Sequence, residues 1–425
     1  MPLAIAGLPL AIYIPPFYTQ EVGLELTIVG VVLMLARVTD VFVDPLIGMW
    51  SDRHPTPLGR RRPWVLLGAV VMMLGAWRLF VPPAGVGPGY LLGWIFVLYL
   101  GWSLLSIPYA AWGAELSTDY HERSRITGAR EMCMVVGLIL AATVPYAIAL
   151  GGGQGLAPGL RALATLTVVL LPVCAILLVV FVPEPRAMEA VGTLGWRHGL
   201  AIVWRNGPFK RLLLAAVLGG FAASINQSLA ILFYVHVLKL PASAQGLILL
   251  YFLAGIVAVP FWVAASKRST KHRTLAYSGF WACAWFMLAP FLPPERMLPV
   301  AVLNIMTGIS MAVPQVLGAS MAADVVDLDT VESGEGRAAL FFALWGMGTK
   351  LALALGVGVA LSLLDLFGFD PKATNGPVQL RALTLLYCTV PVVLWIGSLA
   401  TIWNFPLTRE RQQSLRETID RAVAS

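Results

Sequence analysis

Apolar segments about as long as a lipid bilayer is thick follow one another along almost the whole chain, with short charged loops between them. A helix needs about 20 apolar residues to cross the hydrocarbon core, and a helix satisfies its own backbone polar groups there. The composition agrees, since 58% of the 425 residues are hydrophobic and 12% are charged. The sequence therefore predicts an all-α membrane protein. We place twelve transmembrane helices at 3–22, 27–50, 63–82, 89–114, 130–151, 161–182, 210–237, 243–265, 274–293, 298–323, 338–364 and 382–404.

Basic residues mark one side of the membrane. Clusters of arginine and lysine follow the second, fourth, sixth, eighth and twelfth helices, while the alternate loops carry few. We expect the protein to lie in a cell inner or plasma membrane. By the positive-inside rule, these loops and both termini are on its cytoplasmic side. The net charge of +7 follows from this topology. Because no soluble module presents a basic face, we expect the lipid bilayer as a partner but no nucleic acid, and we expect a monomer.

The longest polar connection, 183–209, divides the twelve helices six and six. This layout is typical of transporters whose halves rock about a central site. The first segment lacks the basic region of a secretory signal peptide, so we count it as a helix. The predicted parts are an N-terminal six-helix half at 1–182, a cytoplasmic connecting loop at 183–209, a C-terminal six-helix half at 210–405 and a cytoplasmic tail at 406–425.

Three charged residues, Arg37, Asp40 and Asp44, interrupt the apolar segment at 27–50. At ~100° per residue of helix they fall within about 60° of one another, so they share one face. A charge at the centre of a spanning helix costs about 2.5–3.5 kcal/mol even on the lenient insertion scale, and it normally faces a protein interior or a wet cavity. These residues are therefore a candidate functional site.

The loop after this helix reads Gly48-Met-Trp-Ser-Asp52-Arg53 and then Gly59-Arg60-Arg61-Arg62. It resembles the signature loop of the major facilitator superfamily, in which glycine allows close helix approach and Asp/Arg pairs hold the inner helix ends together. The preceding run from Ala36 to Gly48 resembles helix two of the glycoside–pentoside–hexuronide:cation symporters, the melibiose permease family. Further stretches agree with this family along the chain, namely Ser106-Ile107-Pro108-Tyr109, Ala323-Asp324-Val325-Val326-Asp327 and Lys350.

In that family two helix-two aspartates hold the coupling cation, Na⁺, Li⁺ or H⁺. The resemblance implies that Asp40 and Asp44 bind the cation here, and that they are the metal-binding residues if the ion is Na⁺. Ser103 stands where the family places a hydroxyl beside the cation; the alternative is a helix serine that bonds back to its own helix. We expect no cofactor apart from the coupling ion.

Lys350 lies near the middle of the apolar segment at 338–364, with no acidic residue within four positions on its helix. Two adjacent carboxylates without a bound cation repel each other, so a positive charge must balance them. We expect Lys350 and Arg37 to supply that charge. The alternative for Lys350 is a side chain that extends to the membrane interface, although its position is deep for such a reach.

The family's sugar-binding residues are mostly replaced. Its carboxylates, tryptophans and arginine fall on Ala4, Ser106, Ala110, Gln315 and Glu131. The resemblance thus implies a retained cation site without melibiose-type specificity. For each aromatic candidate the alternative is packing between helices or an interfacial belt. The residues that we expect to line a substrate cavity are Tyr13, Tyr18, Ser106, Tyr109, Trp112, Arg130, Glu131, Asn226, Gln227, Gln315, Trp345 and Thr349.

Charged residues at predicted inner helix ends form a candidate cytoplasmic gate, made of Asp52, Arg53, Arg60, Asp324 and Asp327. Arg130 and Glu131 have two interpretations. They form a gate pair with Asp119 or Glu115, or they contact an acidic or zwitterionic substrate.

We predict a secondary active transporter, not an enzyme, with a major facilitator fold. It couples Na⁺ or H⁺ to the symport of a small solute, a sugar or glycoside, by alternating access. One alternative keeps the fold and changes the cargo to a lysolipid, because lysolipid symporters resemble the same family and an apolar, aromatic cavity suits an amphiphile. A remote alternative is an intramembrane Mg²⁺-dependent prenyltransferase that uses Asp40-x-x-x-Asp44 and Asp324-x-x-Asp327 to bind a diphosphate.

Overall fold

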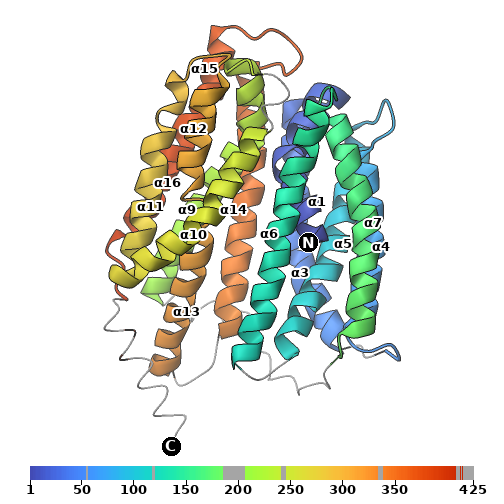
Figure 1. Ribbon diagram of the computed structural model, residues 1–425, viewed down its shortest axis with the longest axis vertical. Coiled ribbons are helices and arrows are strands. Elements are labelled where there is room, and N and C mark those ends of the chain that lie inside the picture. The colour runs from blue at the N-terminus through green and yellow to red at the C-terminus, as the bar shows by residue number, and fades with distance from the viewer. Residues whose placement is uncertain are drawn as a thin grey trace, which may run out of the picture. The chain divides into compact units, whose positions relative to one another are not determined.

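The computed structural model describes residues 1–53, 56–116, 120–184, 206–240, 246–333 and 338–407, together with 412 and 414. Helices account for most of this part (Figure 1). In chain order they are α1 (Pro2–Ile12), α2 (Ile14–Pro16), η1 (Phe17–Val22), α3 (Leu26–Arg53), α4 (Arg62–Phe80), α5 (Pro88–Glu115), α6 (Tyr120–Leu150), α7 (Ala157–Phe181), α9 (Gly207–Leu232), η2 (Phe233–Val237), α10 (Gly246–Arg268), α11 (Lys271–Phe286), η4 (Ala289–Phe291), α12 (Met297–Gly308), α13 (Val313–Ser333), α14 (Ala338–Leu366), α15 (Pro377–Thr384), η5 (Leu385–Thr389) and α16 (Val390–Trp403).

Every predicted transmembrane segment overlaps at least one of these helices. Within the described residues, 10 helices are long and apolar enough to cross a membrane, or up to 11 when α1 and the following helical turns count as one bent span. The segment predicted at 274–293 corresponds to α11, which has 16 residues. The all-α class and the transmembrane helices are thus confirmed, and the count of twelve is consistent with the structure.

Two predicted segments are not single straight helices, and proline explains both. The first is bent by 51° between α1 and Ile14–Val22, where Pro15 and Pro16 have no N–H for the helix hydrogen-bond ladder. The segment predicted at 298–323 ends its first helix at Gly308 and resumes at Val313, with Pro314 in the next turn. A hydropathy average does not register such breaks, because the apolar character continues across them.

The chain forms two compact units. Unit 1 comprises Met1–Glu189, Gln227–Leu249 and Ala354–Thr384; unit 2 comprises Ala190–Asn226, Leu250–Leu353 and Leu385–Ser425. The helices α9, α10 and α14 therefore contribute residues to both units. The boundaries that the sequence predicts at 182, 209 and 405 stay predictions.

In unit 1, α5 packs against both α4 and α3, and α4 also packs against α7 (Figure 1). The approach of α5 to α4 depends on glycine. A Cβ on Gly101 would lie 2.3 Å from the backbone nitrogen of Met72, and one on Gly75 would lie 2.7 Å from Cα of Leu98. Because backbone atoms cannot yield as a flexible side chain does, a larger residue at either position would force the helices apart.

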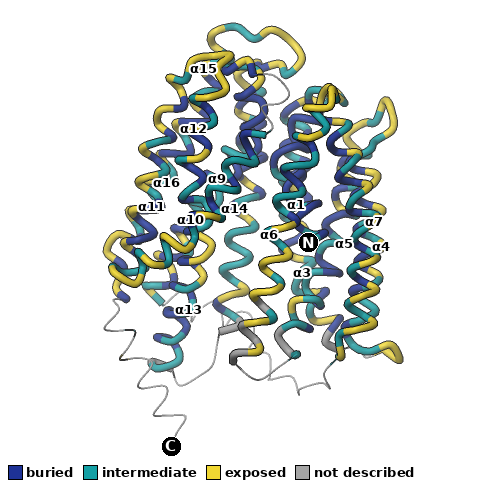
Figure 2. Tube along the Cα trace, viewed as in Figure 1, coloured by how far each residue is buried: buried dark blue, intermediate teal, exposed yellow. Residues whose placement is uncertain are grey.

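Unit 1 also contains a contact between α3 and the last part of α14. Gly30 packs against Gly358, where an added Cβ on Gly30 would lie 3.2 Å from the Gly358 carbonyl oxygen. Nearby, the Thr27 hydroxyl donates a hydrogen bond of 2.5 Å to Oδ2 of Asp365. The helix α1 is buried along most of its length (Figure 2), as expected for a helix that is apolar on all sides.

Unit 2 has a hydrophobic core of its own, built from α9, α11, α13, α14 and α16. Phe209 and Phe341 meet edge to face, with ring centroids 4.8 Å apart. Leu317, Met321 and Val325 on α13 are buried in the same cluster. These three follow one another at four-residue spacing, so one stripe of α13 faces the core.

Candidate functional site

The candidate cation site begins with a contact between α3 and α5. The Ser103 hydroxyl donates a hydrogen bond of 2.7 Å to Oδ1 of Asp40. Both side chains are buried, with Asp40 8% exposed and Ser103 fully covered. The structure thus brings together two of the three residues that the sequence assigns to the cation, and the alternative in which Ser103 bonds only to its own helix does not describe its position.

A second hydrogen bond joins the same two helices one turn away. Nε of Arg37 donates to the phenol oxygen of Tyr99 at 2.8 Å. Sequence reasoning missed Tyr99, although its spacing carried a signal: it precedes Ser103 by four residues, so the two side chains share one face of α5. Arg37 and Asp40 on α3 therefore face Tyr99 and Ser103 on α5 in matching order.

The packing of α5 explains why this face meets α3. Gly101 lies against α4. At ~100° per residue, Tyr99 and Ser103 are each about 200° around the helix from Gly101, so they point away from α4. The glycine contact on one side of α5 thus sets the rotation that presents two hydroxyl groups to α3 on the other.

Asp44 lies one turn beyond Asp40 on α3, half-buried, with its Oδ1 shielded from solvent. Pro45 follows inside the helix and has no N–H to donate to the carbonyl of Val41. Carboxylates and a hydroxyl are hard oxygen ligands that suit Na⁺, and the carboxylates also suit H⁺. Within the described residues, three or more His, Cys, Asp or Glu side chains nowhere gather as a metal cluster.

Lys350 is half-buried on α14, in the part of that helix that belongs to unit 2. Asp40 and Asp44 belong to unit 1. The pairing of Lys350 with these aspartates stays a prediction.

The predicted cavity residues of unit 1 have varied surroundings. Tyr13 is buried, and the Tyr18 hydroxyl donates to the Leu79 carbonyl at 2.8 Å. The indole nitrogen of Trp112 donates to the Pro183 carbonyl at 3.0 Å. Tyr18 and Trp112 thus make interhelical and loop contacts, as their alternative interpretation holds. The remaining members are Ser106, Tyr109 and Gln227, which are half-buried, and Arg130 and Glu131, which form an ion pair of 3.4 Å near the surface.

The predicted cavity residues of unit 2 mostly contact backbone or core. Thr349 bonds back to the Trp345 carbonyl at 3.0 Å, and Trp345 packs against the unit 2 core. The Asn226 amide lies 3.4 Å from the Tyr387 carbonyl oxygen. Gln315 is exposed in the structure. A substrate role for any of these residues stays a prediction.

The candidate gate residues fall at two places. In unit 1, the backbone N–H of Arg60 donates to Oε1 of Glu184 at 2.6 Å, and that of Arg61 donates to the same oxygen. Glu184 also occupies the space beside Gly59, whose φ of +118° favours glycine. Sequence reasoning missed Glu184 because it follows the sixth predicted helix, far from this loop in the chain. The side chains of Asp52 and Arg53, and those of Glu115 and Asp119, lie outside the described residues.

In unit 2, the gate candidate Asp324 is buried and ion-paired. Nζ of Lys271 lies 2.8 Å and 2.7 Å from its two carboxylate oxygens, and the amide of Gln412 also donates to Oδ1. Lys271 is the first residue of α11 and was not among the predicted site residues. Asp327, one turn further along α13, is half-buried.

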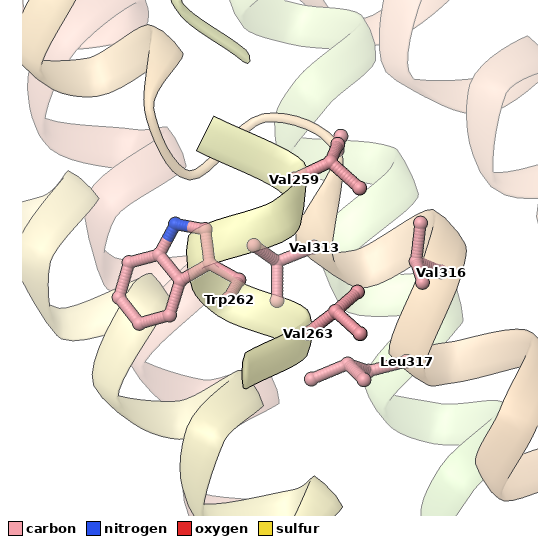
Figure 3. A pocket seen from close by; sticks show the side chains of 7 residues that line it. Val259, Trp262, Val263, Val313, Val316 and Leu317 are labelled. Atoms are coloured by element: carbon pink, nitrogen blue, oxygen red, sulfur yellow. The ribbon is translucent and has the colours of Figure 1, made fainter. Parts of the chain in front are cut away.

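A small hollow lies between α10 and the α12–α13 segment (Figure 3). Its lining side chains are apolar except for the indole N–H of Trp262, which donates to the Ile309 carbonyl at 2.9 Å. The hollow therefore has no charged ligand for an ion. Its lining residues are Val259, Trp262, Val263, Ala312, Val313, Val316 and Leu317.

Residues 1–409 match the family model described as MFS/sugar transport protein. The chain belongs to this family. The MFS/sugar transport family consists of membrane transporters, so the chain is a multi-pass membrane transporter and not an enzyme, and the prenyltransferase alternative falls. The resemblance that the sequence shows to cation symporters of the major facilitator superfamily is thereby confirmed.

Proteins similar to this chain in sequence include two kinds of cation-coupled symporter, one described for glycosides and one for lysophosphatidylcholine. The chain is 26% identical over 414 residues to the putative glycoside/cation symporter YagG of Escherichia coli, covering 94% of this chain and 88% of the relative. It is 24% identical over 431 residues to the sodium-dependent lysophosphatidylcholine symporter 1 of Homo sapiens, covering 92% and 78%. Both similarities extend over most of the two proteins.

Solved structures confirm the major facilitator fold. The nucleoside transporter NupG superposes with a TM-score of 0.66 at 14% sequence identity, covering 94% of this chain and 96% of that one. A structure reported for substrate recognition in proton dependent oligopeptide transporters superposes with a TM-score of 0.64, also at 14% identity, covering 97% and 96%. At this identity the similarity concerns the fold alone.

Proposed function

We propose that the protein is a secondary active symporter that couples a cation bound at Asp40 and Asp44 to the uptake of a small solute by alternating access. The single observation that carries this proposal is the buried hydrogen bond from Ser103 to Asp40, one helical turn from Asp44. Ionisable groups in a spanning helix are costly, and they normally line ion or substrate pathways. Lys350 and Arg37 balance the carboxylates when the cation has left.

The coupling ion is Na⁺ or H⁺. The oxygen ligands fit Na⁺, and the named relatives are described as sodium-dependent or cation symporters. A carboxylate is also a binding group for H⁺, so the same two side chains suit either ion. Coupling requires that occupancy of the cation site and of the solute site favour each other.

The solute is a sugar or glycoside in the main proposal, which the family description and the glycoside/cation relative support. A second candidate is a lysolipid. It is favoured by the apolar or neutral residues at Ala4 and Ser106, where melibiose-type transporters carry carboxylates, and by the lysophosphatidylcholine relative. We further propose that the protein works as a monomer in a plasma or inner membrane, with both termini in the cytoplasm and Asp324, Asp327 and Arg60 near the cytoplasmic helix ends.

Purified protein in detergent tests the solute first. Thermal unfolding is measured against a panel of sugars, glycosides and lysophosphatidylcholine, with and without Na⁺, because a ligand that binds the folded state raises the unfolding temperature. The hit is then followed as radiolabelled uptake into proteoliposomes under an imposed Na⁺ or H⁺ gradient. Accumulation driven by one of the two gradients is the expected result. Uptake that never exceeds equilibration under either gradient contradicts the coupling proposal.

A further inference from the structure

Two hydroxyl groups on one face of α5 contact two charged residues on one face of α3. Tyr99 accepts from Nε of Arg37 at 2.8 Å, and Ser103 donates to Oδ1 of Asp40 at 2.7 Å. Three of these side chains are at most 9% exposed, and Arg37 is half-buried. In the Arg37–Tyr99 contact, a neutral oxygen from the neighbouring helix therefore binds a guanidinium group in a largely apolar environment.

Arg37 has a second possible partner on its own helix. Side chains three apart on a helix are about 5–6 Å apart at Cβ, which places Asp40 within reach of a flexible arginine. An arginine that forms a fork-like pair with a carboxylate competes with a metal ion for the same oxygens. In the structure the Nε–H of Arg37 instead donates to the phenol oxygen of Tyr99.

We propose that Tyr99 is a positioning residue of the cation site: its phenol oxygen keeps the Arg37 guanidinium from forming a direct ion pair with Asp40, so that Arg37 balances the charge from a distance while the carboxylate oxygens stay available to the cation. This inference rests on the proposed function, since it assigns a role at the same site. Ser103 orients the carboxylate, and Tyr99 orients the arginine that competes for it. The two residues lie one turn apart on α5, so the rotation of this helix sets both contacts.

Replacing Tyr99 with phenylalanine tests the proposal, because only the phenol oxygen is removed. Arg37 then turns to Asp40, and the half-saturating cation concentration of uptake rises by roughly three- to tenfold, as expected for the loss of one hydrogen bond to a charged group. The maximal rate at saturating cation stays within about twofold, since the cation displaces the arginine once its concentration suffices.

Removing the arginine separates positioning from packing. In an Arg37→Gln background no guanidinium competes, so Tyr99→Phe changes the half-saturating cation concentration by less than about twofold. A purely structural role of the phenol predicts the same change in both backgrounds. Tyr90→Phe is the matched control: Tyr90 lies on the same helix, and its hydroxyl donates to the Arg78 carbonyl at 2.7 Å. It should leave the cation dependence unchanged.

All variants are measured in proteoliposomes after the unfolding temperature has shown that they fold. Wild-type uptake without cation dependence overturns the proposed function and this inference with it. Cation-dependent wild-type uptake with an unchanged Tyr99→Phe response, or with equal changes in both backgrounds, overturns the inference alone. If Tyr99→Phe does not fold, the Arg37→Gln double variant decides. If the double variant folds, the Arg37 guanidinium left without the phenol oxygen caused the misfolding of Tyr99→Phe. If the double variant also fails to fold, the inference is overturned.

Discussion

Asp40 in unit 1 and Asp324 in unit 2 are both buried carboxylates on long helices, 8% and 6% exposed, yet their surroundings differ. Asp40 accepts a hydrogen bond from the hydroxyl of Ser103. Both oxygens of Asp324 accept from the ammonium of Lys271, and an amide adds a further contact. A hydroxyl stabilises a carboxylate without altering the net charge of the site, whereas an ammonium neutralises it.

This difference separates a carboxylate suited to a changing partner from one suited to a permanent partner. Removing one member of a buried ion pair is strongly destabilising, so a lysine held on two oxygens favours a fixed structure. The hydrogen bond from Ser103 does not itself neutralise the charge of Asp40. The contrast agrees with the coupling role proposed for Asp40, and we propose that Asp324 attaches α13 to the start of α11.

The largest expected effect tests this assignment directly. Asp40→Asn or Asp44→Asn should abolish concentrative uptake while the protein stays in the membrane, because the change deletes a cation ligand and lowers the cost of insertion. Asp324→Asn should retain uptake driven by the cation gradient. Proteoliposome accumulation under the gradient measures both, and exchange of substrate down its own gradient serves as the control for a folded transporter. Normal substrate accumulation by both Asp40→Asn and Asp44→Asn contradicts the coupling role of these aspartates.

The second prediction concerns the permanent pair. Lys271→Met should lower the free energy of unfolding by about 1–3 kcal/mol, toward the lower end because the lysine side chain is 30% exposed. Adding Asp324→Asn should recover part of the loss, since the stranded charge is then gone. Thermal unfolding in detergent measures these variants beside Lys210→Met, an exposed lysine on α9. Additive losses in the double variant would show that the two groups do not stabilise each other.

The third prediction asks whether Asp40 also has a charged partner in the cation-free state. If Lys350 balances Asp40 or Asp44, Lys350→Ala strands negative charge, and the double variant with Asp→Asn at the partner should be at least as stable. The expected coupling energy is about 0.5–3 kcal/mol in a double-mutant cycle read by thermal unfolding. One cycle uses Asp40→Asn and the other uses Asp44→Asn. Strict additivity in both cycles removes Lys350 from the coupling mechanism.

The smallest expected effect concerns the hydroxyl itself. Ser103→Ala should raise the half-saturating cation concentration by roughly tenfold, equivalent to about 1.4 kcal/mol, because one hydrogen bond to a charged group is lost. Ser106→Ala is the comparison, a half-buried serine three residues further along α5; as an expected cavity residue it should change the dependence of uptake on the solute and not on the cation. Cation titrations of uptake compare the two. A larger effect at Ser106 would move the site to a different face of α5.

The helical architecture was predictable because long apolar runs determine membrane-spanning helices with little ambiguity. The contact between Asp40 and Ser103 was also predictable, since charges in such runs are rare and the family resemblance supplies the hydroxyl; the cation-binding role of Asp40, Asp44 and Ser103 stays a prediction. Tyr99 was not, because its partner depends on how α5 is rotated, and that rotation is set by the contact of Gly101 with Met72 on another helix. Glu184 was missed for a similar reason: its carboxylate meets a loop that lies more than a hundred residues earlier in the chain.

The helix α14 begins in unit 2 and ends in unit 1. Gly358 is packed against Gly30 in unit 1, and Lys350 lies eight residues away in the part that belongs to unit 2. At 1.5 Å per residue the distance along the helix is about 12 Å. A tilt of about 10° around the glycine contact therefore moves the backbone at Lys350 by about 2 Å, more than a hydrogen bond or ion pair tolerates. The close contact between Gly30 on α3 and Gly358 on α14 therefore restricts the tilt of α14, and a larger residue at either glycine should displace the backbone at Lys350.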